Sequence, residues 1–261
     1  MAYVLLEVQD GIGTITFNHD EKRNALSKAL LADFYAALTS CKAAKARVLV
    51  LRARSGAKVW SSGHDLTELP KPGSGSDPLS YVDPVERLIR AVEHFPAPVI
   101  GMIDGSVWGG AFELALVCDM LIGTSNVSFA ITPTKIGIPY NSTGLLHFIN
   151  AVGMSTIKEM FFTARPISAQ RAEQLGILNY LVAHDELERF TYEMARTIAD
   201  NSPLSIAVIK EQLRILGNAH PLSPETFERI QSLRQAVFDS RDYLEGTRAM
   251  REKRRPVFTG E

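Results

Sequence analysis

Short apolar runs that alternate with helical patterns constrain the fold of this chain most strongly. Residues 48–51 read VLVL, and residues 98–104 and 120–123 form similar apolar runs. Runs of this length without polar alternation are typical of strands that are covered on both faces. Helical patterns over 28–44 and 111–117 accompany these runs. Because parallel strands need long crossover connections, the alternation predicts an α/β fold with parallel strands.

The first part of the chain carries three local signals. Residues 3–17 contain two strand-like runs around Asp10-Gly11, which predicts a β-hairpin. Ser27 is a good N-cap for the helix that follows it, because its hydroxyl can accept a hydrogen bond from a free backbone N–H. Further along, the composition of residues 70–78 (PKPGSGSDP) predicts a flexible loop.

The last third of the chain has an almost entirely helical pattern. We expect helices over residues 168–175, 185–200, 203–217, 223–238 and 240–253. The change in pattern predicts two parts, an α/β core over residues 1–195 and a C-terminal helical region over residues 196–261. Since no long linker separates them, the helical region is expected to dock on the core or on a neighbouring subunit.

Composition and charge argue against several classes of protein. The 261 residues are 46% hydrophobic and 22% charged, which is typical of a globular protein and not of a disordered chain. Lys plus Arg and Asp plus Glu number 28 and 29, so the net charge of -1 provides no strongly basic field for nucleic acid. The most apolar stretch, 99–123, contains Asp104, Glu113 and Asp119, which a membrane span tolerates poorly.

The two cysteines, Cys41 and Cys118, are expected to be buried free thiols. Neither belongs to a CxxC or Cys/His spacing, so the sequence predicts no structural metal site. Free thiols suit a reducing compartment. The first ten residues, MAYVLLEVQD, lack the basic start of a signal peptide. We therefore expect a cytoplasmic protein.

Two glycine-containing segments are candidates for binding a ligand through backbone N–H groups. The segment SSGHD at 61–65 follows an apolar run, and glycine lets the backbone approach a ligand closely. The alternative is a surface turn in which His64 has no chemical role. Gly109-Gly110 precedes a short helix, whose free N–H groups can stabilise an anion. Glu113 in the first turn of that helix either takes part in chemistry or only complements the helix dipole.

Two further segments are weaker candidates. Residues 132–141 (TPTKIGIPYN) contain prolines and a glycine that predict an ordered irregular loop ending near Tyr140. Tyr140 is either a catalytic residue or an amphipathic packing residue. The cationic run over 248–255 either binds a phosphate group or complements the dipole of its own helix.

Taken together, these segments resemble the crotonase (enoyl-CoA hydratase/isomerase) superfamily. The matching elements are KRNAL at 22–26, SSGHDLTEL at 61–69, GSVWGGAFELAL at 105–116, KIGIP at 135–139 and DSRDYLEGTRAMREKRRPVF at 239–258. The resemblance implies a crotonase-like spiral of ββα units with a C-terminal helical trimerisation region. It also implies an oxyanion hole for an acyl-CoA thioester, formed by the backbone N–H groups of His64 and Gly110.

One position departs from the pattern of the hydratases in this superfamily. Their reaction needs two carboxylates, and Glu113 matches the first, but Pro133 stands where the second would lie. The motifs GHDLTELP at 63–70, DPLSYVDP at 77–84, GSVWGGAFE at 105–113 and PYN at 139–141 are instead similar to superfamily members that decarboxylate methylmalonyl-CoA to propionyl-CoA and CO₂. This resemblance implies that Tyr140 is catalytic. Loss of CO₂ needs no base to start, and the electrons that it leaves enter the thioester carbonyl in the oxyanion hole.

The resemblance also implies which residues bind the substrate. Those near the reacting thioester are Ser62, Gly63, His64, Asp65, Leu66, Gly110 and Thr132. The CoA nucleotide would contact Lys22, Arg23 and Ala25, and Lys253 would reach a phosphate, often that of a neighbouring subunit. No metal and no separate cofactor are implied, because CoA is part of the substrate. The implied assembly is a homotrimer or a dimer of trimers.

Two other functions remain open at this point. A hydratase or isomerase could use Glu113 alone, although Pro133 argues against hydration. An acyl-CoA-binding or assembly subunit without turnover is the other alternative. The oxyanion-hole glycines and Tyr140 argue against a site that has lost its chemistry.

Overall fold

The structure is a computed structural model that describes residues 2–69, 79–80, 82–218 and 223–260. Within these residues the larger sheet has six strands in the order β1-β2-β3-β5-β7-β10, and only the β1–β2 pair is antiparallel. The strands are β1 (Val4–Gln9), β2 (Ile12–Phe17), β3 (Val48–Ala53), β5 (Val99–Ile103), β7 (Met120–Gly123) and β10 (Tyr180–Leu181). The predicted hairpin and the predicted α/β fold with parallel strands are therefore confirmed.

A second, smaller sheet carries the loops that form the site. It has four short strands in the described residues, in the order β4-β6-β8-β9, namely β4 (Val59–Ser61), β6 (Ser106–Trp108), β8 (Ser128–Ala130) and β9 (Ile167–Ser168). β4, β6 and β8 follow β3, β5 and β7 in the chain, and β4–β6 and β6–β8 are parallel pairs. Each turn of the chain thus adds one strand to each sheet, so the ends of β4 and β6 lie side by side.

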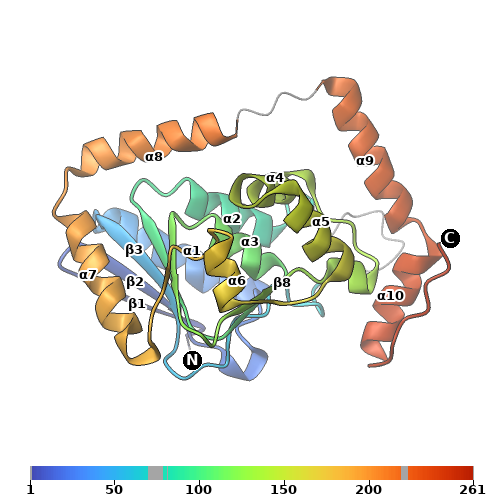
Figure 1. Ribbon diagram of the computed structural model, residues 1–261, viewed down its shortest axis with the longest axis horizontal. Coiled ribbons are helices and arrows are strands. Elements are labelled where there is room, and N and C mark those ends of the chain that lie inside the picture. Colours follow the sequence, from blue (N-terminus) through green and yellow to red (C-terminus); the bar gives the residue numbers. More distant parts are fainter. Residues whose placement is uncertain (1, 70–78, 81, 219–222, 261) are drawn as a thin grey trace.

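Helices cover the two faces of the larger sheet (Figure 1). Leu49 and Leu51 of β3 belong to the main hydrophobic core with the first helices, whereas Val48 and Val50 pack in a second cluster that includes Leu187 of α7. These four residues of β3 are all fully buried, which explains why the run 48–51 has no polar alternation. The helices before the C-terminal region are α1 (Lys28–Ala43), α2 (Pro84–Glu93), α3 (Gly110–Leu116), α4 (Ser142–Ala151), α5 (Met154–Thr163), α6 (Ala169–Gln174) and α7 (Leu187–Ala199).

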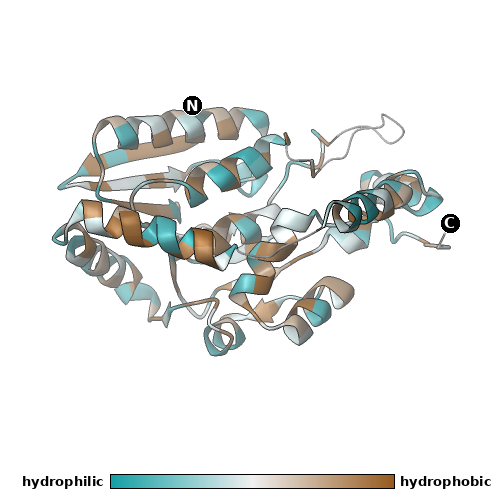
Figure 2. Ribbon diagram, turned by 90° about the horizontal axis from the view of Figure 1, so that it is seen from above, coloured by the Kyte–Doolittle hydropathy of each residue, from teal (hydrophilic) through white to brown (hydrophobic). Residues whose placement is uncertain are grey.

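The C-terminal helices lie on the outside of the molecule. They are α8 (Pro203–Gly217), α9 (Pro224–Phe238) and α10 (Arg241–Arg251). Figure 1 shows α8 above the larger sheet, and α9 and α10 at the right of the view, away from this sheet. No residue of α8 is buried, and several of its exposed side chains are large and apolar. Figure 2 shows brown bands between teal ones along this helix. Such exposed apolar surface is typical of a protein–protein interface.

Most of the predicted elements are present, and several others were missed. Ser27 caps α1 by accepting a hydrogen bond from the N–H of Leu30, as predicted. Cys41 and Cys118 are buried free thiols, as expected. The helices α2, α4 and α5 and the short strands of the second sheet were not predicted from the sequence. No helix in the described part of the chain is long and apolar enough to span a membrane.

Two predictions about the organisation of the chain stay untested. The loop predicted over residues 70–78 lies outside the described residues. The division between an α/β core and a helical region after residue 195 remains a prediction. The proposed boundary falls within α7, and this helix packs on the larger sheet through Leu187, Ala195 and Ala199.

Candidate active site

A mainly apolar cavity of about 320 Å³ opens where the smaller sheet meets the loop before α4. Its walls come from the ends of β4 and β6 and from a short 3₁₀ helix, η2 (Pro133–Ile136). The described lining residues are Ser62, His64, Leu66, Leu69, Leu79, Gly109, Gly110, Thr132, Pro133, Lys135, Ile136, Ile138 and Tyr140. This cavity therefore brings together six of the residues that the sequence suggested for the site.

Gly63 allows the two glycine-containing segments to touch. Its φ angle of 79° lies in the left-handed region, which strongly favours glycine. A Cβ atom at this position would lie 2.6 Å from the carbonyl oxygen of Trp108 and 2.9 Å from the backbone nitrogen of Gly110. No side chain fits there without moving the backbone of the other segment. The requirement for glycine at position 63 is thus both conformational and steric.

The backbone N–H groups of His64 and Gly110 are available to a ligand at this contact. Gly110 is the first residue of α3, and the first N–H groups of a helix have no partner within it. Neither N–H donates to a protein acceptor within the described residues. Two unpaired N–H donors at the edge of an apolar cavity form a place where a negatively charged oxygen is stabilised.

Buried polar contacts hold the segment that carries the first of these donors. The side chain of Asn24 donates to the carbonyl oxygens of Val59 and Trp60, at 3.2 and 3.0 Å. The hydroxyl of Ser61 donates to the carbonyl oxygen of Asn24 at 2.7 Å. The N–H of Ser62 donates to the carbonyl oxygen of Arg23 at 3.0 Å. The end of β4 is therefore fixed to the 22–26 segment on both sides of Asn24.

The side chain of His64 is held beside the second donor. Its Nε2 lies 3.1 Å from Oδ1 of Asp83, the N-cap of α2. A Cβ atom on Gly110 would lie 2.7 Å from Nδ1 of His64, so the imidazole ring rests against the start of α3. The side chain thus braces the contact between the two segments, and its backbone supplies the donor.

Behind Tyr140 lies a buried polar cluster centred on Glu113. The hydroxyl of Tyr140 donates to Oε2 of Glu113 at 2.5 Å, and Nδ1 of His147 lies 2.9 Å from Oε1 of the same carboxylate. Glu113 itself has no exposed surface and is absent from the cavity lining. A Cβ atom on Gly144 would clash with both Tyr140 and Glu113, so glycine lets α4 approach this closely.

The cluster changes the pKa values of its members in consistent directions. Burial, the negative charges of Glu113 and Glu86, and the hydrogen bond to Glu113 raise the pKa of Tyr140 well above its ordinary value of 10.0. Burial alone lowers the pKa of His147, but its hydrogen bond to Glu113 and the charges of Glu113 and Glu93 raise it overall. Tyr140 therefore stays protonated at neutral pH, and protonation of His147 is favoured.

Glu86 is a second buried carboxyl group near the site, on the first turn of α2. Burial raises its pKa from 4.5 to about 9, and the charges of Glu113 and Asp83 add to the shift. The side chain of Asn141, the N-cap of α4, donates to Oε1 of Glu86 at 2.8 Å. At neutral pH the carboxyl group is thus protonated, and it links α2 to the start of α4.

Replacing Glu86 with glutamine is expected to stabilise the protein more as the pH rises. Folding of the natural chain keeps a proton on Glu86 between pH 4.5 and about 9, whereas the unfolded chain releases it. Stability from this group is therefore fully present below pH 4.5 and lost as the pH rises through that window. Glu86→Gln keeps the hydrogen bond to Asn141 without the titration, and we expect a gain of about 1–3 kcal/mol at pH 8.

Urea unfolding of Glu86→Gln at pH 5 and pH 8 measures this effect. Glu173→Gln, a change of the same kind on the exposed surface of α6, is the matched control. Equal stability changes for the two variants at both pH values would contradict the buried, protonated state of Glu86.

The predicted site residues do not all lie at the cavity. Ser62, His64, Leu66, Gly110, Thr132 and Tyr140 line the cavity, while Gly63 and Glu113 lie directly behind its wall. The side chain of Asp65 instead accepts hydrogen bonds from Thr67 and stabilises the turn. Lys22, Arg23 and Ala25 lie outside the lining, next to the end of β4, and Lys253 follows α10 on the exposed surface.

The residues that support the site from behind were not predicted from the sequence. His147 lies within the apolar helix α4, and Glu86 and Asn141 read as ordinary residues at helix starts. The only signal was a histidine in an otherwise apolar segment, LLHFIN. Within the described residues, no group of three or more His, Cys, Asp or Glu side chains has an arrangement that could hold a metal ion.

Comparison with known proteins places this site in a family. The sequence profile of the enoyl-CoA hydratase/isomerase family matches residues 7–261. The chain is 48% identical to the methylmalonyl-CoA decarboxylase of Escherichia coli (strain K12), over 99% of this chain and 98% of that protein. It is 32% identical to the mitochondrial enoyl-CoA hydratase domain-containing protein 2 of Bos taurus, over 96% of this chain and 85% of that protein.

Solved structures agree with the sequence comparisons. Methylmalonyl-CoA decarboxylase in complex with 2-nitronate-propionyl-CoA superposes with a TM-score of 0.96 at 47% identity and covers 99% of both chains. The same enzyme complexed with 2S-carboxypropyl CoA also gives a TM-score of 0.96 at 47% identity, over 100% of this chain and 99% of that one. With its two mostly parallel sheets, its contacting glycine segments and its C-terminal helices, the chain belongs to the enoyl-CoA hydratase/isomerase (crotonase) family.

Proposed function

We propose that this protein is a carbon–carbon lyase that decarboxylates methylmalonyl-CoA to propionyl-CoA and CO₂. One observation carries the proposal: the cavity offers two free backbone N–H donors but no carboxylate side chain among its described lining residues. Such a site stabilises an enolate oxygen without providing a base. The 48% identity to methylmalonyl-CoA decarboxylase of Escherichia coli supports the same substrate.

In the proposed reaction, the thioester oxygen accepts hydrogen bonds from the N–H groups of His64 and Gly110. The bond between C2 and the carboxylate breaks, CO₂ leaves, and the electron pair moves into the thioester to form an enolate. Preorganised donors stabilise the negative oxygen in the transition state more than the neutral carbonyl, which lowers the barrier. A proton must then be added to C2 to give propionyl-CoA.

Thr132 and Tyr140 line the same cavity and suit a carboxylate that has to leave. The hydroxyl of Thr132 makes no capping hydrogen bond to η2, and it is a suitable donor for orienting the carboxylate. The hydroxyl proton of Tyr140 is directed to Glu113. The phenol oxygen therefore donates no strong hydrogen bond to the carboxylate of the substrate. A carboxylate held weakly in an apolar cavity is not stabilised in the ground state, which favours decarboxylation.

Hydration or isomerisation with Glu113 as the base is less compatible with this arrangement. Both oxygens of Glu113 accept hydrogen bonds from protein side chains, and the residue has no exposed surface. A base has to reach the proton that it removes, directly or through one water molecule. Tyr140 stands between Glu113 and the cavity, and Pro133 provides no second carboxylate.

Incubation of the purified protein with methylmalonyl-CoA tests the proposal. We expect propionyl-CoA and CO₂ in equal amounts by mass spectrometry, and no hydration of crotonyl-CoA under the same conditions. Hydration or isomerisation of the enoyl thioester without decarboxylation would instead favour Glu113 chemistry. Binding of both thioesters with turnover of neither would indicate a binding subunit.

We further propose that CoA is bound as part of the substrate, without a separate cofactor. The carbonyl oxygen of Arg23 accepts a hydrogen bond from the N–H of Ser62, which lines the cavity. This position beside the cavity supports contacts of Lys22, Arg23 and Ala25 with the nucleotide of CoA. Lys253 is proposed to reach a phosphate of the CoA that is bound to a neighbouring subunit. The buried free thiols support a cytoplasmic location.

A homotrimer or dimer of trimers is proposed, and substitution on α8 tests for such an assembly. Leu204 and Leu216, at the two ends of this helix, are 80% and 72% exposed in the single chain. Burial of such side chains in an interface contributes about 1.5–3 kcal/mol each. We expect Leu216→Glu to shift the protein toward monomers in mass photometry, while Lys158→Glu, at an exposed position of α5, leaves the distribution unchanged.

A further inference from the structure

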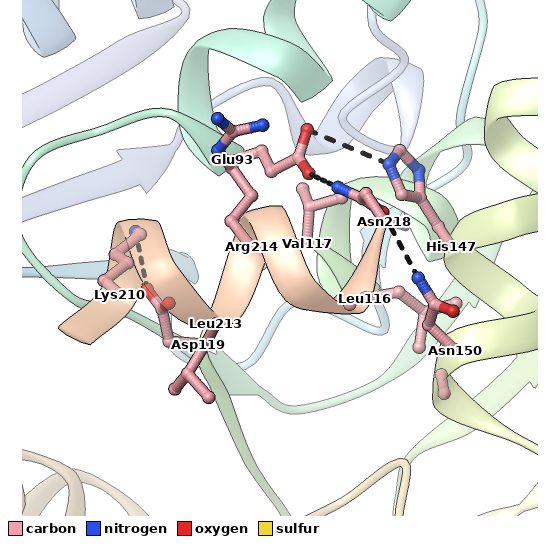
Figure 3. A pocket seen from close by; sticks show the side chains of 12 residues that line it. Glu93, Leu116, Val117, Asp119, His147, Asn150, Lys210, Leu213, Arg214 and Asn218 are labelled. Atoms are coloured by element: carbon pink, nitrogen blue, oxygen red, sulfur yellow. Dashed lines mark hydrogen bonds and ion pairs between the residues drawn. The ribbon is translucent and has the colours of Figure 1, made fainter. Parts of the chain in front are cut away.

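A second cavity, of about 280 Å³, lies on the other side of the buried polar cluster from the candidate active site. It is formed by the ends of α2 and α3, by α4 and by α8, and Figure 3 shows His147 and Glu93 pointing toward each other in its wall. His147 lines this cavity with one edge of its ring and contacts Glu113 with the other. The first cavity is lined by Tyr140, which contacts the same carboxylate.

These contacts form a continuous chain between the two cavities. It runs from the hydroxyl of Tyr140 to Glu113 over 2.5 Å and from Glu113 to Nδ1 of His147 over 2.9 Å. Nε2 of His147 lies 3.9 Å from a carboxylate oxygen of Glu93. Glu93 is itself held by the side-chain amide of Asn218 at 3.1 Å. The links from Tyr140 to Glu113 and from Glu113 to His147 have hydrogen-bond distances, and they join groups that can carry a proton.

We propose that the proton that replaces CO₂ on C2 comes from Tyr140 and is replenished through Glu113 and His147 from the second cavity. The inference rests on the proposed decarboxylation. Each turnover consumes one proton, and the cavity that holds the substrate has no acidic side chain among its described lining residues. Tyr140 is the lining residue that is connected to a protonated group behind the wall.

The relay starts from the state in which both oxygens of Glu113 accept hydrogen bonds and His147 carries a proton on each ring nitrogen. After CO₂ leaves, the Tyr140 hydroxyl turns from Glu113 toward C2 of the enolate and gives up its proton, and the electron pair returns from oxygen to re-form the thioester carbonyl. Nδ1 of His147 gives its proton to Oε1 of Glu113, and the carboxyl group then turns and passes this proton to the phenolate oxygen of Tyr140. The imidazole is left neutral with its remaining proton on Nε2, and exchange of this proton with solvent in the second cavity allows one proton to be taken up and Nδ1 to be protonated again. The net change is one proton bound to carbon and one removed from solvent.

The electrostatic surroundings of His147 suit a group that stores a proton. Glu113 on α3 and Glu93 on α2 both lie close and favour its charged form. Three further charged groups line the same cavity, and Lys210 and Asp119 form an ion pair at 2.7 Å in it. The charged groups around the cavity are Glu93, Glu113, Asp119, Lys210 and Arg214. His147 acts through Glu113 and Tyr140, so it is a positioning and proton-supplying residue and not a group that touches substrate.

The variant His147→Asn separates proton supply from hydrogen bonding. The side-chain amide of asparagine occupies the place of Nδ1 and keeps the contact with Glu113, but it carries no exchangeable charge. We expect its kcat for decarboxylation to fall about 100-fold with KM within 2-fold of wild type, as is typical when a general acid is lost. Wild-type kcat should decline above the raised pKa of His147, and the variant should lack this decline.

Two further variants complete the test. His94→Asn is the matched control, because Nε2 of His94 lies 3.7 Å from the same Glu93 oxygen, yet its side chain is half exposed. It should keep wild-type kinetics. His147→Ala should regain activity when imidazole is added, since the ring's place opens to the second cavity. Wild-type kcat and pH profile in His147→Asn would overturn the relay while the proposed function stands. Absence of propionyl-CoA with the wild-type protein would overturn both.

Discussion

Replacing Gly63 with alanine is expected to lower kcat for the proposed decarboxylation about 100- to 1000-fold. The added methyl group would sit 2.6 Å from the carbonyl oxygen of Trp108 and 2.9 Å from the nitrogen of Gly110, so one of the two segments has to move. Movement of either segment takes the N–H groups of His64 and Gly110 out of alignment with the thioester oxygen. Removing one such donor typically costs about 10²–10³ in kcat.

Gly56→Ala is the control for backbone strain in this experiment. Gly56 also has a left-handed φ angle, 80°, but a Cβ atom there meets no other atom within 4 Å. Both substitutions cost about 1–2 kcal/mol of stability because alanine disfavours this conformation. Only Gly63→Ala should lose turnover in assays of propionyl-CoA formation. Equal kcat values in the two variants would show that the contact between the glycine segments is not required.

Replacing Tyr140 with phenylalanine should lower kcat about 100-fold with little change in KM. The phenyl ring keeps the edge-to-face packing against Phe148 and Phe161, at centroid distances of 6.0 and 5.2 Å. The variant loses the hydroxyl, and with it the proposed proton donor. It also leaves one oxygen of the buried Glu113 without its donor, which costs about 1–3 kcal/mol of stability.

Tyr192→Phe separates the catalytic loss from a general effect of removing a tyrosine hydroxyl. The hydroxyl of Tyr192 makes a 2.8 Å hydrogen bond with Thr14, which lies in β2 away from the cavity. Steady-state kinetics and urea unfolding of both variants are the measurements. Tyr192→Phe should lose stability only. Unchanged turnover of Tyr140→Phe would remove Tyr140 from the mechanism.

The parts of the fold that were predicted from the sequence have patterns set by local geometry. β3 has a continuous apolar run because alternate residues enter two different hydrophobic clusters. Asp10 and Gly11 both take positive φ angles, at 51° and 76°, in the turn that the Asp-Gly pair predicts. The strands β4, β6 and β8 were missed because three residues are too few to show a period.

Some residues of the candidate site could likewise be predicted from the sequence, and others could not. The glycine segments and Tyr140 carry motifs of the family, so the sequence was sufficient to place them together. His147, Glu86 and Asn141 were missed because their role depends on how α2, α3 and α4 pack, and their own segments show no such signal. A buried polar residue in a helix has the same sequence pattern as an exposed one until its neighbours are known.

A crystal structure of this protein with 2-nitronate-propionyl-CoA would test the central claim most directly. The nitronate is a planar anion at C2 and stands in for the enolate that forms when CO₂ leaves. The distances from the thioester oxygen to the backbone nitrogens of His64 and Gly110 should both lie at about 2.7–3.1 Å. A thioester oxygen more than about 4 Å from either nitrogen, with the ligand ordered in the cavity, would contradict the proposed oxyanion hole.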